Sequence, residues 1–322
     1  MDRYLITGGA GFIGSHLAHG LVARGDSVRV LDSLATGRRE NIADLEVGAV
    51  GSGAPVEWLH GDLLDRGALE RSLAGIRGVF HEAAQVSVPR SVAEPESSLE
   101  LNAMGTARLL EGMRRVGVKA IVAAASSAAY GNSVELPKHE DLPVQPLSPY
   151  AIGKVAMEQM LSVWGELHGM NTVSLRYFNI FGSRQRDDSP YTGVIAIFAR
   201  RLLDGLPVTI HGDGGQTRDF TYVDNAVSAN LLAMDAALAG RVAPGRVLNV
   251  GAGERTSVLD LYNALAELAG TKARPEFSES RAGDVRDSFA SLDRIRAELG
   301  YEPVVGFREG LERTLEWYRN SA

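Results

Sequence analysis

The chain of 322 residues contains 45% hydrophobic and 23% charged residues, a balance typical of a globular protein rather than a disordered or fibrous one. Its net charge of −7 argues against a nucleic-acid-binding surface, and the lack of cysteine excludes disulfides and thiolate chemistry. No apolar stretch has the length of a membrane span, Met1 is followed by no signal-peptide pattern, and no histidine cluster indicates a metal, so we expect a cytoplasmic protein without a metal.

Residues 1–178 alternate short apolar runs with amphipathic helical stretches, a pattern typical of parallel strands joined by crossover helices. Several runs are apolar throughout, as expected for strands buried on both faces. The sequence therefore predicts an α/β fold with a doubly wound parallel sheet of the Rossmann type. The expected strands are residues 4–7, 27–32, 56–60, 78–81, 120–125 and 172–177, and residues 48–55 are expected to form a surface loop.

The second part of the chain has a less regular alternation of predicted elements. From residue 179 onward the loops are longer, and turn signals at residues 212–215 and 281–284 separate fewer regular elements. We expect residues 179–322 to form a smaller α/β lobe that binds the substrate. An amphipathic helix at 224–234 and an apolar strand at 246–250 indicate that parts of about 220–250 return to the first lobe.

A glycine-rich turn follows the first expected strand. Gly8, Gly11 and Gly14 are evenly spaced around the start of a helix near Phe12. The first glycine allows a tight turn, the second lets the backbone approach a pyrophosphate, and the third lets the helix pack closely against the sheet. Asp32, at the end of the second strand, can accept hydrogen bonds from both hydroxyls of an adenosine ribose, whereas a 2′-phosphate there would be repelled. The pattern predicts a dinucleotide cofactor and favours NAD over NADP.

Further cofactor contacts are expected where later strands end. Arg38 and Arg39 could in principle meet a phosphate, which keeps NADP as the alternative. Asp62 and Leu63, after the third strand, fit an adenine contact. The small side chains that follow the fourth strand would line the cofactor.

A tyrosine and a lysine lie one turn apart at a well-marked helix start. Ser148 is a good N-cap, Pro149 suits the first helical position, and Tyr150 and Lys154 then share one face of the helix. An ammonium about 4 Å from a phenol is worth roughly 4 kcal/mol at an effective dielectric near 20, or about three pK units. The sequence therefore predicts that Lys154 lowers the pKa of Tyr150, which can then act as a base near neutral pH.

The segments TGGAGFIG, HEAAQ, ASSAAYG, SPYAIGK and RYFNIFG occur in this order, with Asp62 between the first two. Over essentially its full length the chain resembles the extended short-chain dehydrogenase/reductase family, and within it the UDP-glucose and UDP-N-acetylglucosamine 4-epimerases. The resemblance implies a catalytic group of Ser126, Tyr150 and Lys154, with NAD in the first lobe and Tyr177 beside its nicotinamide. The expected cofactor-binding residues are Gly8, Gly11, Phe12, Ile13, Gly14, Asp32, Asp62, Leu63, Ala83, Ala84, Gln85, Tyr150, Lys154 and Tyr177.

The resemblance also implies a UDP-sugar clamp in the second lobe. Val194 and Phe198 would border the uridine, and residues 209–211 would pair with the uracil. Arg218 and Arg281 would face the diphosphate, whose oxygens match guanidinium groups, and Asp284 would hold the uridine ribose. The expected substrate-binding residues are Ser87, Ser126, Asn179, Val194, Phe198, Thr209, His211, Arg218, Arg281, Asp284 and Ser288.

The implied reaction is inversion at C4 of the sugar through a 4-keto intermediate. Tyr150 would remove the proton of the C4 hydroxyl, Ser126 would bridge that hydroxyl to Tyr150, and Lys154 would hold the cofactor ribose. The hydride would leave C4 for tightly bound NAD and return to the opposite face.

The side chains expected in the sugar pocket bear on the substrate. A small Ser288, beside Ser87 and Asn179, would leave room for a 2-acetamido group, so N-acetylated and plain hexoses are both expected substrates. Val86 and Ala128 depart from the glycine and serine of relatives that prefer acetamido sugars.

Three other functions compete with this hypothesis. A UDP-glucuronate decarboxylase or 4-epimerase would need a cation or a hydroxyl that binds the C6 carboxylate. Asn179 at its position and the lack of an obvious extra arginine in the sugar pocket count against these enzymes. A sugar 4,6-dehydratase would carry an Asp-Glu pair where this chain has Ser127 and Ala128. A non-catalytic NAD or nucleotide-sugar binding protein would not need the intact catalytic group.

The chain is also expected to form a homodimer. The helices at residues 99–115 and 150–168 carry apolar residues on more than one face, and the second face could bury against a copy of the chain.

Overall fold

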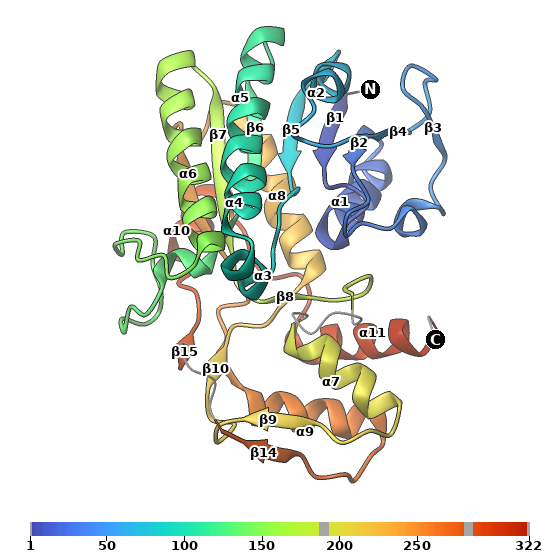
Figure 1. The fold of residues 1–322 in the computed structure, drawn as a ribbon, viewed down its shortest axis with the longest axis vertical. Coiled ribbons are helices and arrows are strands. Elements are labelled where there is room, and N and C mark those ends of the chain that lie inside the picture. Colours follow the sequence, from blue (N-terminus) through green and yellow to red (C-terminus); the bar gives the residue numbers. More distant parts are fainter. Residues whose placement is uncertain (1, 187–192, 280–285, 321–322) are drawn as a thin grey trace.

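The computed structural model describes residues 2–186, 193–279 and 286–320. Its largest feature is a parallel sheet with the strand order β12-β7-β6-β5-β1-β2-β4-β3, seen in the upper part of Figure 1. The order reverses beside β1, as in a doubly wound sheet, which confirms the predicted fold. The strands are β1 (Arg3–Thr7), β2 (Ser27–Asp32), β3 (Val47–Ala49), β4 (Val56–His60), β5 (Gly78–His81), β6 (Ala120–Ser126), β7 (Asn171–Tyr177) and β12 (Arg246–Val250).

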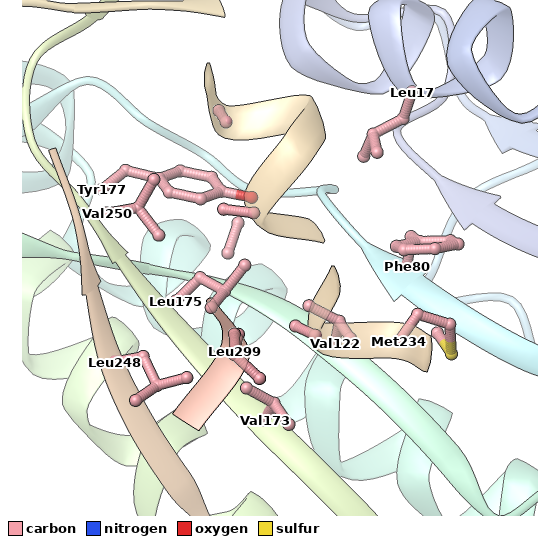
Figure 2. Packing of buried hydrophobic residues seen from close by; sticks show 14 of the residues in the cluster. Leu17, Phe80, Val122, Val173, Leu175, Tyr177, Met234, Leu248, Val250 and Leu299 are labelled. Carbon is pink, nitrogen blue, oxygen red and sulfur yellow. The ribbon is translucent and has the colours of Figure 1, made fainter. Parts of the chain in front are cut away.

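Helices cover both faces of this sheet, which explains why several of its strands are mostly apolar. Successive strand residues point to opposite faces, so Ile121 belongs to one apolar core and Val122 to the other. Figure 2 shows part of the core that contains Val122. The covering helices are α1 (Phe12–Ala23), α8 (Val223–Leu238) and α10 (Asp293–Leu299) on that face, and α2 (Arg66–Leu73), α5 (Gly105–Val116) and α6 (Pro149–His168) on the other.

A third apolar core lies in the lower part of Figure 1, below the sheet. It joins α7 (Val194–Leu203), α9 (Val258–Ala269) and α11 (Phe307–Asn320). In contrast, β12 and α8 lie in and against the large sheet although they belong to the second half of the chain. The remaining strands are β8 (Ile180–Phe181), β9 (Thr209–His211), β10 (Thr217–Arg218), β11 (Thr221–Tyr222), β13 (Thr256–Ser257), β14 (Glu276–Ser278) and β15 (Asp287–Ser288).

Two sequence predictions about local structure need correction. Residues 48–55 are not loop throughout, because β3 pairs with β4 and forms an edge of the sheet. The helix expected at 99–115 is interrupted by a π-helical turn at Glu100–Met104, preceded by α3 (Val88–Ala93) and α4 (Pro95–Leu99). None of the helices in the described segments is both long and apolar enough to cross a membrane.

Candidate active site

The glycine turn after β1 forms a close cradle at the start of α1. Gly8 has a φ of 71°, which side chains disfavour, and its carbonyl accepts a hydrogen bond of 3.0 Å from the Gly11 N–H. A Cβ at Gly14 would lie only 2.2 Å from that carbonyl oxygen, so only glycine lets the helix approach the turn this closely. The tight turn expected at Gly8 and the close packing expected at Gly14 are present. The N-terminus of α1 lies at this turn, where a helix can face an anion.

Asp32 ends β2 beside this turn, and two backbone groups fix its carboxylate. One oxygen accepts a hydrogen bond of 2.9 Å from the Ala10 N–H, and the other accepts one of 2.8 Å from the Leu34 N–H. Each carboxylate oxygen keeps a further lone pair. A ribose with free 2′ and 3′ hydroxyls suits these acceptors, so the cradle and the carboxylate together fit NAD.

The other predicted cofactor residues lie at the ends of neighbouring strands. Asp62 is exposed and accepts a hydrogen bond of 2.8 Å from the Leu64 N–H, whereas Leu63 is 4% exposed and belongs to an apolar core. After β5, the Ala83 backbone lies so close to Gly8 that a Cβ on the glycine would be 2.8 Å from the Ala83 nitrogen. Ala84 and Gln85 follow Ala83, and Phe12 and Ile13 form the first turn of α1.

The structure brings the three predicted catalytic residues to one cavity of about 270 Å³ at the carboxyl ends of β5, β6 and β7. This is the edge at which parallel α/β sheets bind ligands. The cavity is lined by Ile13, Glu82, Val86, Ala124, Ala125, Ser126, Ser127, Tyr150, Lys154, Tyr177, Asn179 and Ile180.

Helix α6 begins as the sequence predicts. The Ser148 hydroxyl accepts a hydrogen bond of 3.2 Å from the Ala151 N–H, and Pro149 occupies the first turn. Tyr150 and Lys154 therefore project from the N-terminal turns of α6, and Ser126 approaches from the end of β6.

The prediction that Lys154 lowers the pKa of Tyr150 is wrong for the protein itself. Burial raises the pKa of Tyr150, and a hydrogen bond with Ser126 offsets part of that rise. Burial also lowers the pKa of Lys154, whose Nζ donates a hydrogen bond of 2.6 Å to the Ala124 carbonyl. Helical spacing brings the pair to one cavity, but the ammonium is directed to the backbone of β6.

One carboxylate in the cavity wall is not among the residues predicted from the sequence. Glu82 follows β5 directly, and its carboxylate accepts a hydrogen bond of 2.9 Å from the hydroxyl of Tyr177. That hydroxyl accepts a bond of 2.6 Å from the side-chain amide of Asn230 on α8. The position of Glu82 at the carboxyl end of a strand is the one signal that could have found it.

The predicted sugar-pocket residues are only partly brought together. Asn179, with a φ of 34°, lines the cavity, and its side chain donates a hydrogen bond of 3.2 Å to the Asp219 carbonyl. Val86 lines the cavity, whereas Ser87 caps α3 by accepting a hydrogen bond of 3.2 Å from the Arg90 N–H.

The predicted nucleotide contacts lie in the lower lobe. Val194 begins α7, and Phe198 on the same helix packs its ring 6.2 Å from that of Tyr262. Thr209 and His211 are the ends of β9, and the His211 ring lies 2.8 Å from the Ser278 hydroxyl.

Two more of these predicted residues lie side by side on neighbouring strands. Arg218 on β10 is in register with Ser288 on β15. Its guanidinium donates hydrogen bonds of 2.8 and 3.1 Å to the carbonyls of Thr217 and Arg286. Arg281 and Asp284 lie outside the described residues.

Comparisons with known proteins agree with this geometry. The family described as "NAD dependent epimerase/dehydratase family" matches residues 4–251. A UDP-glucose 4-epimerase from Mycolicibacterium smegmatis is 39% identical over 99% of both chains.

Two solved structures share the fold over nearly all of this chain. The UDP-glucose 4-epimerase of Thermus thermophilus, in complex with NAD, has a TM-score of 0.87 and 40% identity over 99% of this chain and 100% of that one. The UDP-N-acetylglucosamine 4-epimerase of Methanobrevibacter ruminantium M1, in complex with UDP-N-acetylmuramic acid, has a TM-score of 0.92 and 32% identity over 100% and 99%. These matches and the glycine cradle confirm the family and the cofactor predicted from the sequence: the chain belongs to the NAD-dependent epimerase/dehydratase family, among the UDP-sugar 4-epimerases of the extended short-chain dehydrogenase/reductase type.

Proposed function

We propose that this protein interconverts UDP-glucose and UDP-galactose, UDP-N-acetylglucosamine and UDP-N-acetylgalactosamine, or both pairs, with NAD tightly bound. The observation that carries the proposal is the single cavity that unites Ser126, Tyr150 and Lys154 next to the glycine cradle. A base, a hydroxyl and a cation at the carboxyl edge of the sheet suit the oxidation and reduction of an alcohol.

The proposed roles follow from the positions of the side chains. Bound NAD would supply the acceptor and donor of the C4 hydride. Tyr150 takes the proton of the C4 hydroxyl and returns it after the sugar has turned. Ser126 positions the C4 hydroxyl by hydrogen bonding to it and to Tyr150. Because Tyr150 has a raised pKa in the protein alone, the base would depend on the positive charge that oxidised NAD adds when it is bound. Lys154, in the same cavity wall, would hold the cofactor ribose.

The substrate is proposed to lie across the two parts of the chain. Residues 1–178, with parts of about 220–250, would form the NAD-binding lobe, and residues 179–322 would hold the nucleotide. In that lobe Val194, Phe198, Thr209 and His211 would contact the uridine, and Arg218 with Arg281 and Asp284 would grip the diphosphate and ribose.

The sugar pocket leaves both series of hexoses as substrates. Val86 and Asn179 are in the cavity wall, and Ser288 presents a small side chain on β15 beside Arg218. The names of similar proteins include both UDP-glucose and UDP-N-acetylglucosamine 4-epimerases. The preferred sugar of this protein therefore has to be measured.

A homodimer is proposed from the outer surface of α5 and α6. Val163 and Leu167 on α6 are 48% and 71% exposed, and Val116 at the end of α5 is 48% exposed. Large apolar side chains exposed on neighbouring helices favour an interface with a second copy. A monomeric mass by light scattering at micromolar concentration would contradict the dimer.

The test is a direct assay of the purified protein without added cofactor. UDP-glucose, UDP-N-acetylglucosamine and UDP-glucuronate are incubated separately, and the products are resolved chromatographically. Conversion of either of the first two to its C4 epimer is the expected result, and the ratio of their rates gives the preferred sugar. Reaction of UDP-glucuronate alone would contradict the proposal, and a Tyr150→Phe sample controls for contaminating epimerase.

A further inference from the structure

The proposed reaction leaves one ionisable residue of the cavity, Glu82, without a role. The chemistry needs one base and one cation, yet Glu82 lines the same cavity as Tyr150 and Lys154. A carboxylate disfavours a phenolate nearby, because like charges repel. Glu82 therefore has to serve another group of the site.

Two buried side chains fix the orientation of Glu82. The hydroxyl of Tyr177, a residue 9% exposed, donates the hydrogen bond of 2.9 Å to the Glu82 carboxylate. Asn230 is fully buried and donates to that hydroxyl at 2.6 Å and to the Ala226 carbonyl at 2.8 Å. Because the Tyr177 hydroxyl accepts from Asn230, its single proton is directed to Glu82. Figure 2 shows the Tyr177 ring beside Val250 of the apolar core.

Lys154 is the cation in need of a counter-charge. It is 4% exposed, and the Ala124 carbonyl at 2.6 Å is a neutral acceptor. Burial favours the neutral amine and lowers the pKa of Lys154, whereas the carboxylates of Glu82 and Glu158 act in the opposite direction. Burial also raises the pKa of Glu82 to about 7, and the Tyr177 hydrogen bond and the charge of Lys154 oppose that rise.

The other ionisable groups near Lys154 are either paired with another residue or neutral. Glu158, one turn further along α6, forms two hydrogen bonds of 2.9 and 2.8 Å with the buried guanidinium of Arg176 on β7. On β5, burial and the charge of Lys154 lower the pKa of His81 to about 3, so its imidazole is neutral. Tyr150 and Tyr177 have raised pKa values and are neutral near pH 7.

We propose that Glu82 is a positioning residue of the active site, whose carboxylate, held by Tyr177, is the counter-ion of the Lys154 ammonium. The inference rests on the proposed function for its catalytic consequence, since that function needs the Lys154 ammonium to hold the cofactor ribose beside Tyr150. The electrostatic pairing belongs to the protein alone and can be measured without turnover.

The composition of the chain makes a direct test possible. Its four lysines are Lys119, Lys138, Lys154 and Lys272, so lysine-selective 13C labelling gives only four sets of side-chain signals. Lys154 is assigned by the signal that is missing in Lys154→Arg. In Glu82→Gln, the NMR titration midpoint of Lys154 is expected to fall by about one pH unit, because one negative charge near a shielded ammonium is removed.

Two further variants distinguish this effect from a general disturbance. Glu82→Asp keeps the charge, and its midpoint is expected to stay nearer to that of the wild type. Glu166→Gln removes an exposed carboxylate from the same helix, 12 residues or about 18 Å from Lys154 and beyond the Debye length, and is expected to change nothing. An unchanged Lys154 midpoint in folded Glu82→Gln would overturn the inference.

Kinetics then connect the pairing with the reaction. The alkaline limb of the kcat/KM profile of Glu82→Gln is expected to move to lower pH by the same amount as the Lys154 midpoint, whereas a merely structural role would lower the rate without moving the limb. An inactive wild type with the NMR shift would refute the proposed function and support the pairing. An active wild type whose Glu82→Gln variant shows neither shift would refute the pairing alone.

Discussion

The substitution Gly14→Ala tests the cofactor cradle most sharply. A Cβ at this position would lie 2.2 Å from the Gly8 carbonyl oxygen and 2.8 Å from the Gly9 Cα. Both contacts are backbone atoms, so no side-chain rotation can relieve them. Since non-bonded heavy atoms prefer separations of about 3.5 Å, the start of α1 must move away from the turn by roughly 1 Å.

The size of the effect follows from two opposing terms. Overpacking of a close contact costs about 1–3 kcal/mol, whereas alanine inside a helix is favoured over glycine by about 1 kcal/mol. The displaced turn is the part of the chain that would face the pyrophosphate, so the strain should appear in cofactor binding. The net cost is about 0–2 kcal/mol, and we expect its upper half because both contacts are with backbone atoms. At 1.4 kcal/mol for each factor of ten, NAD should bind Gly14→Ala about 5- to 30-fold more weakly.

The same helix offers a matched control. A Cβ at Gly20 would lie 3.0 Å from a Val227 side-chain methyl and 3.9 Å from one of Leu231, and both side chains can shift. Calorimetric titration with NAD and urea unfolding are carried out on both variants after removal of bound cofactor. Gly20→Ala is expected to bind NAD as the wild type does. Gly14→Ala with wild-type affinity would refute the assignment of this turn as the pyrophosphate cradle.

Three further substitutions test the remaining parts of the account. Tyr150→Phe removes the proposed base, and epimerase turnover should fall by about three orders of magnitude while the purified protein still carries NAD; activity within tenfold of the wild type would exclude Tyr150 as the base. Glu158→Gln leaves the 3%-exposed Arg176 without its carboxylate, and urea unfolding should show a loss of about 3–5 kcal/mol; a loss under about 1 kcal/mol would contradict the buried pair. His81 has a pKa lowered to about 3 by burial and by Lys154, so the native state binds fewer protons than the unfolded state between that value and about 6.5. The unfolding free energy should therefore fall as the pH is lowered through this window, and it should fall less steeply in His81→Gln; equal slopes in denaturant unfolding at several pH values would contradict the buried neutral imidazole.

Most strands of the large sheet can be predicted from the sequence because burial on both faces leaves an apolar run at each of them. The edge strand β3 cannot, because its residues are half-buried or exposed and its glycine is typical of a turn. The π-helical turn at Glu100–Met104 is hidden for another reason. Helical periodicity continues through it, and the Asn102 side chain is held by the backbone of Gln85, a contact across 17 residues.

The site shows the same division between local and distant causes. Ser148, Pro149 and the spacing of Tyr150 and Lys154 are local signals, and they predict the start of α6 correctly. The pKa values depend on which groups the fold places around these side chains, so spacing alone gives the wrong direction for Tyr150. Glu82 escapes notice because the hydroxyl that holds it comes from a residue 95 positions away.

The most direct test of the central claim is epimerisation in D2O. UDP-glucose and UDP-N-acetylglucosamine are incubated separately with the purified protein, and the products are analysed by proton NMR. Because the account has the C4 hydrogen leave and return as a hydride, the galacto product should form and keep its proton at C4. Deuterium at C4, or no C4 epimer from either substrate, would contradict the account.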